Sequence, residues 1–274
     1  MTISPSPKKI IYDFGSYNGN DIPYYLKKAD LVVAVEANPH LCKQIERSFL
    51  TEITNGRLIL EKCVITSDDL KKEVPFYLHR ELGSAGSQFP EPNKDRIHEF
   101  EQVLLPCRSV LSIVQQYGSP YYIKIDIEHY DAAILKALFM NGIYPPFISA
   151  ESHDIQVFSL LVALGRYNAF KLVDGATLSR KYKNASIYTN NKKELYSFPN
   201  HSAGPFGEDI DGEWMTANNF FRLLAFENLG WKDIHATNQV PPNPKVVSRL
   251  ENYVTLNVLR RKIKRLLLFR SDTE

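Results

Sequence analysis

The feature of this sequence that most constrains its fold is a regular alternation of short apolar runs and longer amphipathic segments over residues 10–151. An uninterrupted apolar run such as residues 31–35 is typical of a parallel strand that is buried on both faces. The amphipathic segments between these runs are typical of helices that cover those faces. The sequence therefore predicts an α/β fold, with a mostly parallel sheet and helices on both faces.

The same pattern assigns individual elements. The predicted strands are residues 10–12, 31–35, 58–60, 74–78, 121–125, 147–150 and 170–173, and the predicted helices are residues 22–28, 41–50, 110–117, 132–140 and 155–164. Asn38 with Pro39 predicts a helix start, and Asn141 with Gly142 predicts a helix stop. After residue 173 the alternation fades, and residues 197–212 have the composition of a long loop, which we expect to be functional, for example as a lid.

Size, charge and cysteine content set the general class of the protein. A chain of 274 residues with 44% hydrophobic content can bury one large core, so we expect one domain over residues 1–244. The net charge of +2 gives no global electrostatic reason to expect nucleic acid as a partner.

Cys42, Cys63 and Cys107 are odd in number and lack metal-site spacing, which predicts buried, reduced thiols in a cytoplasmic protein. The apolar stretch 10–12 is too short for a signal peptide or a membrane span.

Positive charge is concentrated in the C-terminal extension, residues 245–274, which contains eight Lys or Arg against three Asp or Glu. Val247, Leu250, Val254 and Val258 keep helical spacing, so we predict a basic amphipathic helix over residues 246–269. Such a helix can lie on an anionic membrane surface as a peripheral contact. The default alternative is that it packs on its own domain or on a second subunit of a homo-oligomer.

A glycine-containing turn follows the first predicted strand. It runs through Asp13, Gly15, Ser16, Asn18 and Gly19 and leads into the predicted helix 22–28. A parallel strand that ends in such a turn presents backbone N–H groups at the carboxyl edge of the sheet, where ligands bind. The spacing D-x-G-x-x-x-G is not the G-x-G-x-x-G that serves a pyrophosphate. The turn therefore predicts a cofactor without phosphates and disfavours a nucleotide-linked oxidoreductase.

An acidic residue follows the second predicted strand. Glu36, which precedes Ala37, lies roughly 20 residues beyond the first glycine, a separation at which a carboxylate accepts hydrogen bonds from ribose hydroxyls. Asp68 follows the third strand region, where it or its neighbours could meet an adenine amino group. Taken singly, such features are common in loops and helix caps. Together they predict an adenosyl cofactor around Asp13, Gly15 and Glu36, with methyl transfer as the leading chemistry.

Three sequence blocks carry a family resemblance: residues 12–19, residues 35–39 and, above all, Ile-Lys-Ile-Asp-Ile-Glu at 123–128 before the predicted helix 132–140. They resemble the FkbM-type S-adenosylmethionine-dependent methyltransferases, a family linked to O-methylation of sugars and natural products. The resemblance covers most of the chain. It implies a seven-stranded Rossmann-like class I methyltransferase fold, S-adenosylmethionine as cofactor, and a hydroxyl of a sugar, glycan or glycosylated natural product as the methyl acceptor.

Two details qualify this resemblance. The family usually has glycine after the glutamate of the third block, whereas this chain has His129. Residues 201–209 resemble an acceptor-side loop seen in part of the family. The departure at His129 keeps open a non-catalytic adenosyl-ligand-binding or assembly module as the alternative function. A nucleic-acid methyltransferase is disfavoured, because no D/N-P-P-Y/F/W motif for a flipped amino base occurs in the sequence.

Methyl transfer from a sulfonium to an oxygen is an in-line displacement, for which an enzyme aligns the reactants and removes the hydroxyl proton. We expect the base near the carboxyl ends of the fourth and fifth strands of the predicted sheet. His153 is the first candidate and His129 the second, because the imidazole pKa lies near the operating pH, and the alternative is a structural role for either. The polar residues at these two strand ends are Asp126, Glu128, His129, Glu151, His153 and Asp154.

Lys124 and the nearby carboxylates have more than one interpretation. Within a buried strand the charge of Lys124 must either neutralise carboxylates or project toward the site. The carboxylates could hold a divalent cation such as Mg²⁺, or serve as helix caps and as partners of substrate hydroxyls. Residues 84–88 and 201–209 either close over the acceptor or are packed surface loops.

Overall fold

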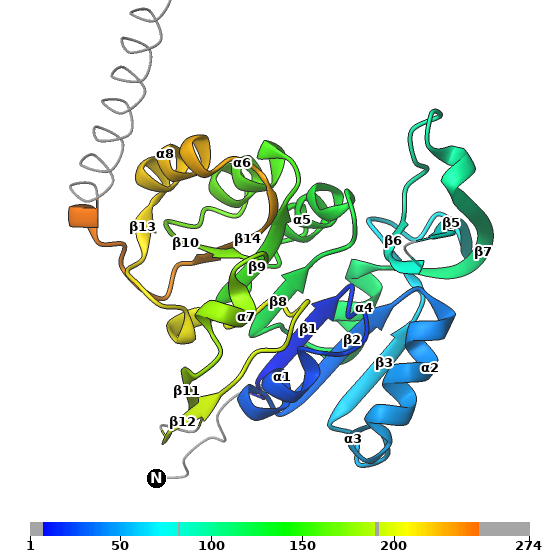
Figure 1. Cartoon of the computed structure of the whole chain (residues 1–274), viewed down its shortest axis with the longest axis horizontal. Helices are drawn as coiled ribbons and strands as arrows, with labels where there is room; N and C mark the ends of the chain where they lie inside the picture. Colours follow the sequence, from blue (N-terminus) through cyan, green and yellow to red (C-terminus); the bar gives the residue numbers. More distant parts are fainter. Residues whose placement is uncertain (1–7, 82, 190–191, 247–274) are drawn as a thin grey trace, which may run out of the picture.

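The centre of the molecule is a twisted, mostly parallel sheet (Figure 1). The computed structural model describes residues 8–81, 83–189 and 192–246. Over these residues the sheet has the strand order β3-β2-β1-β8-β9-β14-β10-β13. The strands are β1 (Ile10–Phe14), β2 (Leu31–Glu36), β3 (Leu58–Lys62), β8 (Tyr122–Ile125), β9 (Phe147–Ser152), β10 (Ala169–Asp174), β13 (Met215–Thr216) and β14 (Gly230–Thr237).

The directions of these strands confirm the predicted architecture. β14 runs antiparallel to both β9 and β10, β13 runs antiparallel to β10, and the neighbours from β3 to β9 are parallel. The sheet therefore has seven main strands, as predicted, and the two-residue β13 adds an eighth at one edge. Every predicted strand except residues 74–78 lies in this sheet.

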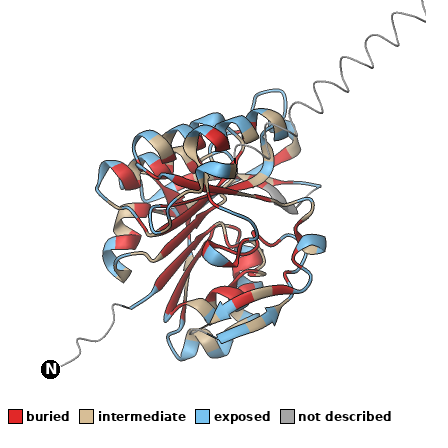
Figure 2. Ribbon diagram, turned by 90° about the vertical axis from the view of Figure 1, so that its left-hand side faces the viewer, coloured by how far each residue is buried: buried red, intermediate tan, exposed pale blue. Residues whose placement is uncertain are grey.

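Helices cover both faces of the sheet, and Figure 2 shows the buried strands between the two outer layers. One face, which includes Tyr12 and Phe14, packs against four helices, and the opposite face, which includes Ile11, packs against shorter helices and a hairpin. The first group is α4 (Val110–Tyr117), α5 (Asp131–Met140), α6 (Ile155–Ala163) and α8 (Ala217–Glu227). The second group is α1 (Ile22–Lys28), α2 (Pro39–Ser48), α3 (Leu50–Thr54), α7 (Leu178–Lys181) and the hairpin of β11 (Ala185–Thr189) and β12 (Lys192–Tyr196).

Local sequence determines where several of these helices begin and end. The Asn38 side chain accepts a hydrogen bond from His40 N, with Pro39 in the first turn of α2. α5 ends before Asn141 and Gly142, and Gly142 has a φ of 73°. Both helix boundaries that the sequence predicts are therefore confirmed.

A second sheet lies beside β2 and β3. Its order is β4-β7-β5-β6, from β4 (Val64–Thr66), β5 (Glu73–His79), β6 (Gly83–Gln88) and β7 (Phe100–Ser109), with the short helix η1 (Ile97–Glu99) before β7. The predicted strand 74–78 belongs to this sheet and not to the central one, which corrects the simple alternation read from the sequence. Sequence patterns identify a strand but not its partner, and β5 pairs with the long, partly exposed β7.

The segment 197–212 is packed into the molecule, and its role as a lid stays a prediction. Its residues 202–207 are buried, and the Phe206 ring stacks on Tyr122 with centroids 4.0 Å apart. In its short helix η2 (Gly207–Asp209), Asp209 accepts a hydrogen bond from Tyr24 Oη at 2.7 Å and pairs with Lys28 at 2.7 Å. The segment therefore covers one face of the sheet, and its first residues reach the cavity described below.

Two expectations about the rest of the chain have different outcomes. Cys42, Cys63 and Cys107 are buried and form no disulfide with one another, as predicted. The predicted helix 246–269 lies outside the described residues, apart from Val246 at the end of η3 (Pro244–Val246). Among the helices of the described ranges, none is long and apolar enough to cross a membrane.

Candidate functional site

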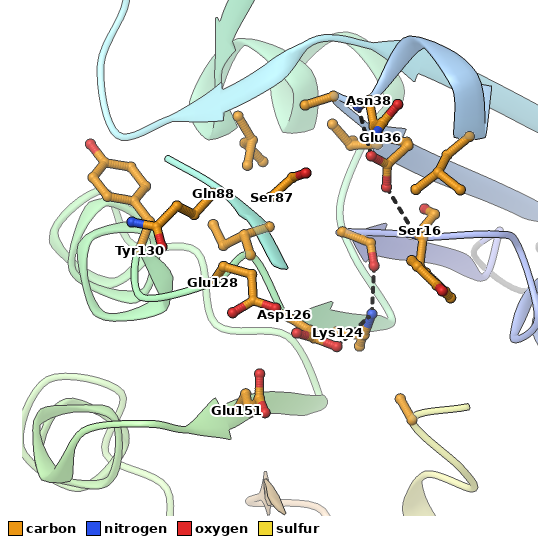
Figure 3. A pocket seen from close by; sticks show the side chains of 18 of the residues that line it. Ser16, Glu36, Asn38, Ser87, Gln88, Lys124, Asp126, Glu128, Tyr130 and Glu151 are labelled. Atoms are coloured by element: carbon orange, nitrogen blue, oxygen red, sulfur yellow. Dashed lines mark hydrogen bonds and ion pairs between the residues drawn. The ribbon is translucent and has the colours of Figure 1, made fainter. Parts of the chain in front are cut away.

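A cavity of about 470 Å³ lies at the carboxyl ends of β1, β2, β8 and β9, where ligands bind in open parallel sheets. Its volume is within the usual range of small-molecule sites. Figure 3 shows Glu36 on one side of the cavity and Asp126, Glu128 and Glu151 on another. We call these the β2 side and the carboxyl side. The predicted site residues that line the cavity are Gly15, Ser16, Asn18, Glu36, Ala37, Lys124, Asp126, Glu128 and His153.

The glycine turn after β1 is fixed by contacts with both neighbouring strands. Gly15 N and Ser16 N donate hydrogen bonds to Val35 O at 3.0 and 3.1 Å. Gly15 has a φ of 80°, and a Cβ at this position would lie 1.8 Å from the carbonyl oxygen of Asp126. A glycine is therefore required here for two reasons, the left-handed conformation and the close approach of the β8 end.

Glu36 is held at the end of β2 by two backbone N–H groups. Its Oε2 accepts a hydrogen bond from Tyr17 N and its Oε1 accepts one from Asn38 N, both at 2.8 Å. Burial raises the pKa of Glu36 to about 7, although both hydrogen bonds favour the ionised form. Each oxygen has a second lone pair, so the carboxylate can accept two further hydrogen bonds from a ligand in the cavity.

The part of the cavity beyond Glu36 is apolar. Its lining includes Leu41, Val64, Ile65, Phe76 and Phe89, which come from α2, the second sheet and the residue after β6. A flat aromatic ligand such as a purine fits a wall of this composition.

Four predicted residues are not among those that line the cavity. Asp68 is exposed and accepts a hydrogen bond from Leu70 N at 3.0 Å, so it caps a turn. Asp13 is buried below the turn after β1, Gly19 packs against α2, and His129 is exposed beside the cavity. Asp13 and Gly19 therefore support the turn from the side that faces away from the cavity.

Lys124 lies buried under the cavity, where it connects β8 to the turn after β1. Its Nζ donates a hydrogen bond to Gly15 O at 2.7 Å and lies 3.4 Å from Asp13 Oδ1 and 3.3 Å from Asp126 Oδ2. Burial alone would lower the pKa of Lys124, but the surrounding carboxylates, led by Asp126 and Asp13, raise it well above its usual value. Of the two roles expected for this lysine, the ion pairs show that it neutralises carboxylates, and Lys124 also lines the cavity.

The carboxyl side contains a pair of acids that share a proton. Burial opposes the ionisation of Asp126, but Lys124 and a hydrogen bond from Glu151 hold its pKa below the usual value. Burial and the charge of Asp126 raise the pKa of Glu151 far above its usual value. Glu151 therefore keeps its proton at neutral pH and donates it to Asp126.

His153 lies between two carboxyl groups. Its Nε2 is 2.7 Å from Glu151 Oε2 and 3.7 Å from Glu128 Oε2. The His129 ring is next to it, with centroids 4.6 Å apart, and burial and the neighbouring His153 lower the pKa of His129. Glu128 and His129 both have left-handed backbones, with φ of 51° and 70°. The departure from glycine at residue 129 therefore occurs at a position whose conformation favours glycine.

The sequence left open a divalent-cation site among the carboxylates. In the described ranges, no group of three or more His, Cys, Asp or Glu is arranged to hold a metal ion. Asp154, one of the proposed ligands, instead caps α6 by accepting a hydrogen bond from Gln156 N at 2.8 Å. Glu151 and Asp126 are hydrogen-bonded to each other.

The sequence patterns missed three other residues that line the cavity. Asp21 is buried and accepts hydrogen bonds from Ser202 Oγ and Ala203 N, and burial raises its pKa to about 6. Trp231 and Asp233 come from β14, which no apolar run predicted because polar residues occupy both faces of this strand. The one sequence signal for them was the spacing of Trp231, Asp233 and His235, which occupy every second position of a short segment.

Neither a protein-family model nor a curated protein matches the sequence. Among solved structures, the chain is similar to the methyltransferase FkbM from Methylobacillus flagellatus KT, with 14% identity and a TM-score of 0.40 over 61% of this chain and 40% of that chain. It is also similar to an O-methyltransferase from Bacillus cereus in complex with SAH, with 9% identity and a TM-score of 0.36 over 86% and 82% of the two chains. A precorrin-6y C5,15-methyltransferase from Geobacter metallireducens GS-15 is similar with 10% identity and a TM-score of 0.34, over 69% of this chain and 74% of that one. The chain spans less than half of the Methylobacillus protein.

Proposed function

We propose that this chain binds S-adenosylmethionine and transfers its methyl group to a hydroxyl oxygen of a sugar, a glycan or a glycosylated natural product. The observation that carries the proposal is Glu36 at the end of β2, whose two carboxylate oxygens are fixed by Tyr17 N and Asn38 N beside the glycine turn. A carboxylate in this position can accept a hydrogen bond from each ribose hydroxyl of an adenosyl group.

The residues present fit this donor. Gly15 brings backbone to the cavity where a side chain would collide with Asp126 O. Leu41, Val64 and Ile65 offer an apolar wall for the adenine ring beyond Glu36. These residues would hold the adenosyl end on the β2 side and leave the carboxyl side to the acceptor.

The chemistry requires one proton to leave the acceptor. When bound, S-adenosylmethionine supplies an electrophilic methyl group on a positively charged sulfur. As the new C–O bond forms and the C–S bond breaks, the hydroxyl proton must pass to a base. We assign that role to His153, whose Nδ1 would take the proton while its Nε2–H faces Glu151 Oε2 at 2.7 Å and Glu128 Oε2 at 3.7 Å. Glu151 would orient the ring as a hydrogen-bond acceptor, and the ionised form of Glu128 would stabilise its positive charge.

The first test is calorimetric titration of the full chain with S-adenosylmethionine and, separately, with NAD. We expect micromolar binding of the methyl donor, about 8 kcal/mol, and no comparable binding of NAD. Glu36→Ala should weaken donor binding about 100-fold, about 2.7 kcal/mol, because the ribose loses a charged hydrogen-bond acceptor. Glu46→Ala, which removes an exposed acid of α2 outside the cavity, should bind the donor as the wild type does.

Donor binding justifies an acceptor screen with labelled methyl groups, starting with sugars and glycolipids. Equal affinity of Glu36→Ala and wild type would remove Glu36 from the ribose, and no donor binding at all would refute the proposed function. Donor binding without methyl transfer to any acceptor would instead support the alternative of a non-catalytic adenosyl-ligand-binding module.

A further inference from the structure

One face of the central sheet carries charged residues at the bottom of the cavity, with more acids than Lys or Arg. Asp13 on β1 is paired with Lys124 on β8, and Glu151 on β9 is paired with Asp233 on β14, in directly opposite register positions. Lys124 is the one Lys or Arg among the described residues that line the cavity, and its Nζ contacts Asp13 and Asp126. No Lys or Arg of the described residues contacts Glu151 or Asp233, and Glu151 lies 2.7 Å from His153 Nε2.

Two acids in directly opposite positions of antiparallel strands repel each other when both are ionised. Glu151 and Asp233 are both more than nine-tenths buried and both line the cavity, and among the described residues none donates a hydrogen bond to the Asp233 side chain. Burial and the charges of Asp126 and Glu151 raise the pKa of Asp233 well above its usual value. A cationic ligand would favour the ionised form of Asp233 and donate the hydrogen bonds that this side chain lacks.

An aromatic ring borders these two acids. Trp231 lies two residues before Asp233 on β14, lines the cavity and is 49% exposed. One side of its indole lies against Gly175, where a Cβ would come within 2.4 Å of the ring, and the His201 ring stacks near it with centroids 5.8 Å apart. An exposed indole beside carboxylates is a common recognition site for an ammonium group, because the ring face and the acids both attract positive charge.

We propose that Glu151, Asp233 and Trp231 form a subsite for a protonated amine carried by the methyl acceptor, which makes the acceptor an amino sugar. This inference rests on the proposed function, since it assigns the acceptor end of the same cavity. An ammonium carries three N–H donors and one positive charge, which match two carboxyl groups that no Lys or Arg of the described residues contacts. A neutral hydroxyl would supply a donor without the charge.

The test uses three sugars with the same ring: glucosamine, which carries a protonated amine, and glucose and N-acetylglucosamine, which are neutral. Calorimetric titration of the full chain at constant ionic strength should show glucosamine binding at least about tenfold more tightly than the other two, about 1.4 kcal/mol. Asp233→Asn should abolish this preference, and so should Glu151→Gln, which provides a second variant if one fails to fold. Asp211→Asn, at an exposed position outside the cavity, is the matched control and should keep the preference.

Fluorescence locates the bound amine. The chain has two tryptophans, and in Trp214→Phe the remaining one is Trp231. Glucosamine should change its emission at the concentrations that saturate the calorimetric signal. Equal affinities for the three sugars, a preference that survives both acid variants, or binding without a change in emission would each overturn the inference. Because donor binding is titrated separately, loss of the amine preference with donor binding intact would reject this subsite and leave the proposed methyl transfer standing.

Discussion

The two sides of the cavity are built in different ways. On the β2 side, the glycine turn and Glu36 are fixed by backbone hydrogen bonds within residues 13–38. On the carboxyl side, the side chains of Asp126, Glu151 and His153 hold one another, and Asp233 lies opposite Glu151 on a third strand. One side is a product of local chain geometry, whereas the other is a set of coupled charges that exists only when the sheet is assembled.

This difference determines how each side should respond to mutation. Where backbone geometry makes the site, a change of shape should damage folding and ligand binding together. Where coupled side chains make the site, a change of one group should alter proton affinity or reaction rate and leave the fold largely unchanged. The effects of mutation should therefore differ between the two sides, and the largest is expected on the β2 side.

Gly15→Ala should cause the largest loss, about 4 kcal/mol of unfolding free energy. Gly15 has a φ of 80°, and a Cβ would lie 1.8 Å from Asp126 O, so the β1 turn and the β8 end must separate. Gly56→Ala is the matched control, because Gly56 has a φ of 72° and nothing within 4 Å of its Cβ. Denaturant unfolding should show a loss of only about 1 kcal/mol in the control. Equal losses in the two variants would show that the close contact at Gly15 is unimportant.

The same division explains how much could be predicted from the sequence. The turn after β1 and Glu36 follow their strands directly, so a local pattern was sufficient to bring them to one cavity. β14 was missed because Lys232 and Asp233 interrupt its apolar pattern, and its place between β9 and β10 depends on pairing with strands far away in the sequence. The packing of residues 197–212 was missed for the same reason, since Pro and Gly suggest a loop but do not show that Phe206 stacks on Tyr122.

His153→Ala should reduce kcat about 100-fold, about 2.7 kcal/mol, on the acceptor that the labelled-methyl screen identifies. Affinity for the methyl donor should change less than twofold, because the β2 side does not depend on this imidazole. His98→Ala removes an exposed histidine outside the cavity and should keep the wild-type rate. A His153→Ala variant with a near-normal rate would move the base to another residue of the carboxyl side.

The smallest predicted effect is a pH dependence of stability, and it arises mainly on the carboxyl side. Burial raises the pKa of Glu128 and of Asp131 to about 7, and burial together with Asp126 raises that of Glu151 further. The folded protein therefore keeps protons that the unfolded chain has released, so this contribution to stability is present at lower pH and is lost as the pH rises through the folded pKa values. Unfolding free energy should fall by about 1 kcal/mol for each of Glu128 and Asp131 between pH 6 and pH 9.

Burial also raises the pKa of Glu36 to about 7, so Glu36 adds to the pH dependence of stability. Glu151→Gln separates the contribution of the carboxyl side from that of Glu36. The amide of the variant can donate a hydrogen bond to Asp126, as the protonated Glu151 does, but it cannot ionise. Denaturant unfolding should therefore show a flatter pH profile and a higher stability than wild type at pH 9. An unchanged profile would mean that Glu151 does not hold a proton in the folded protein, and the carboxyl side would then be a set of independent charges like those of an ordinary surface.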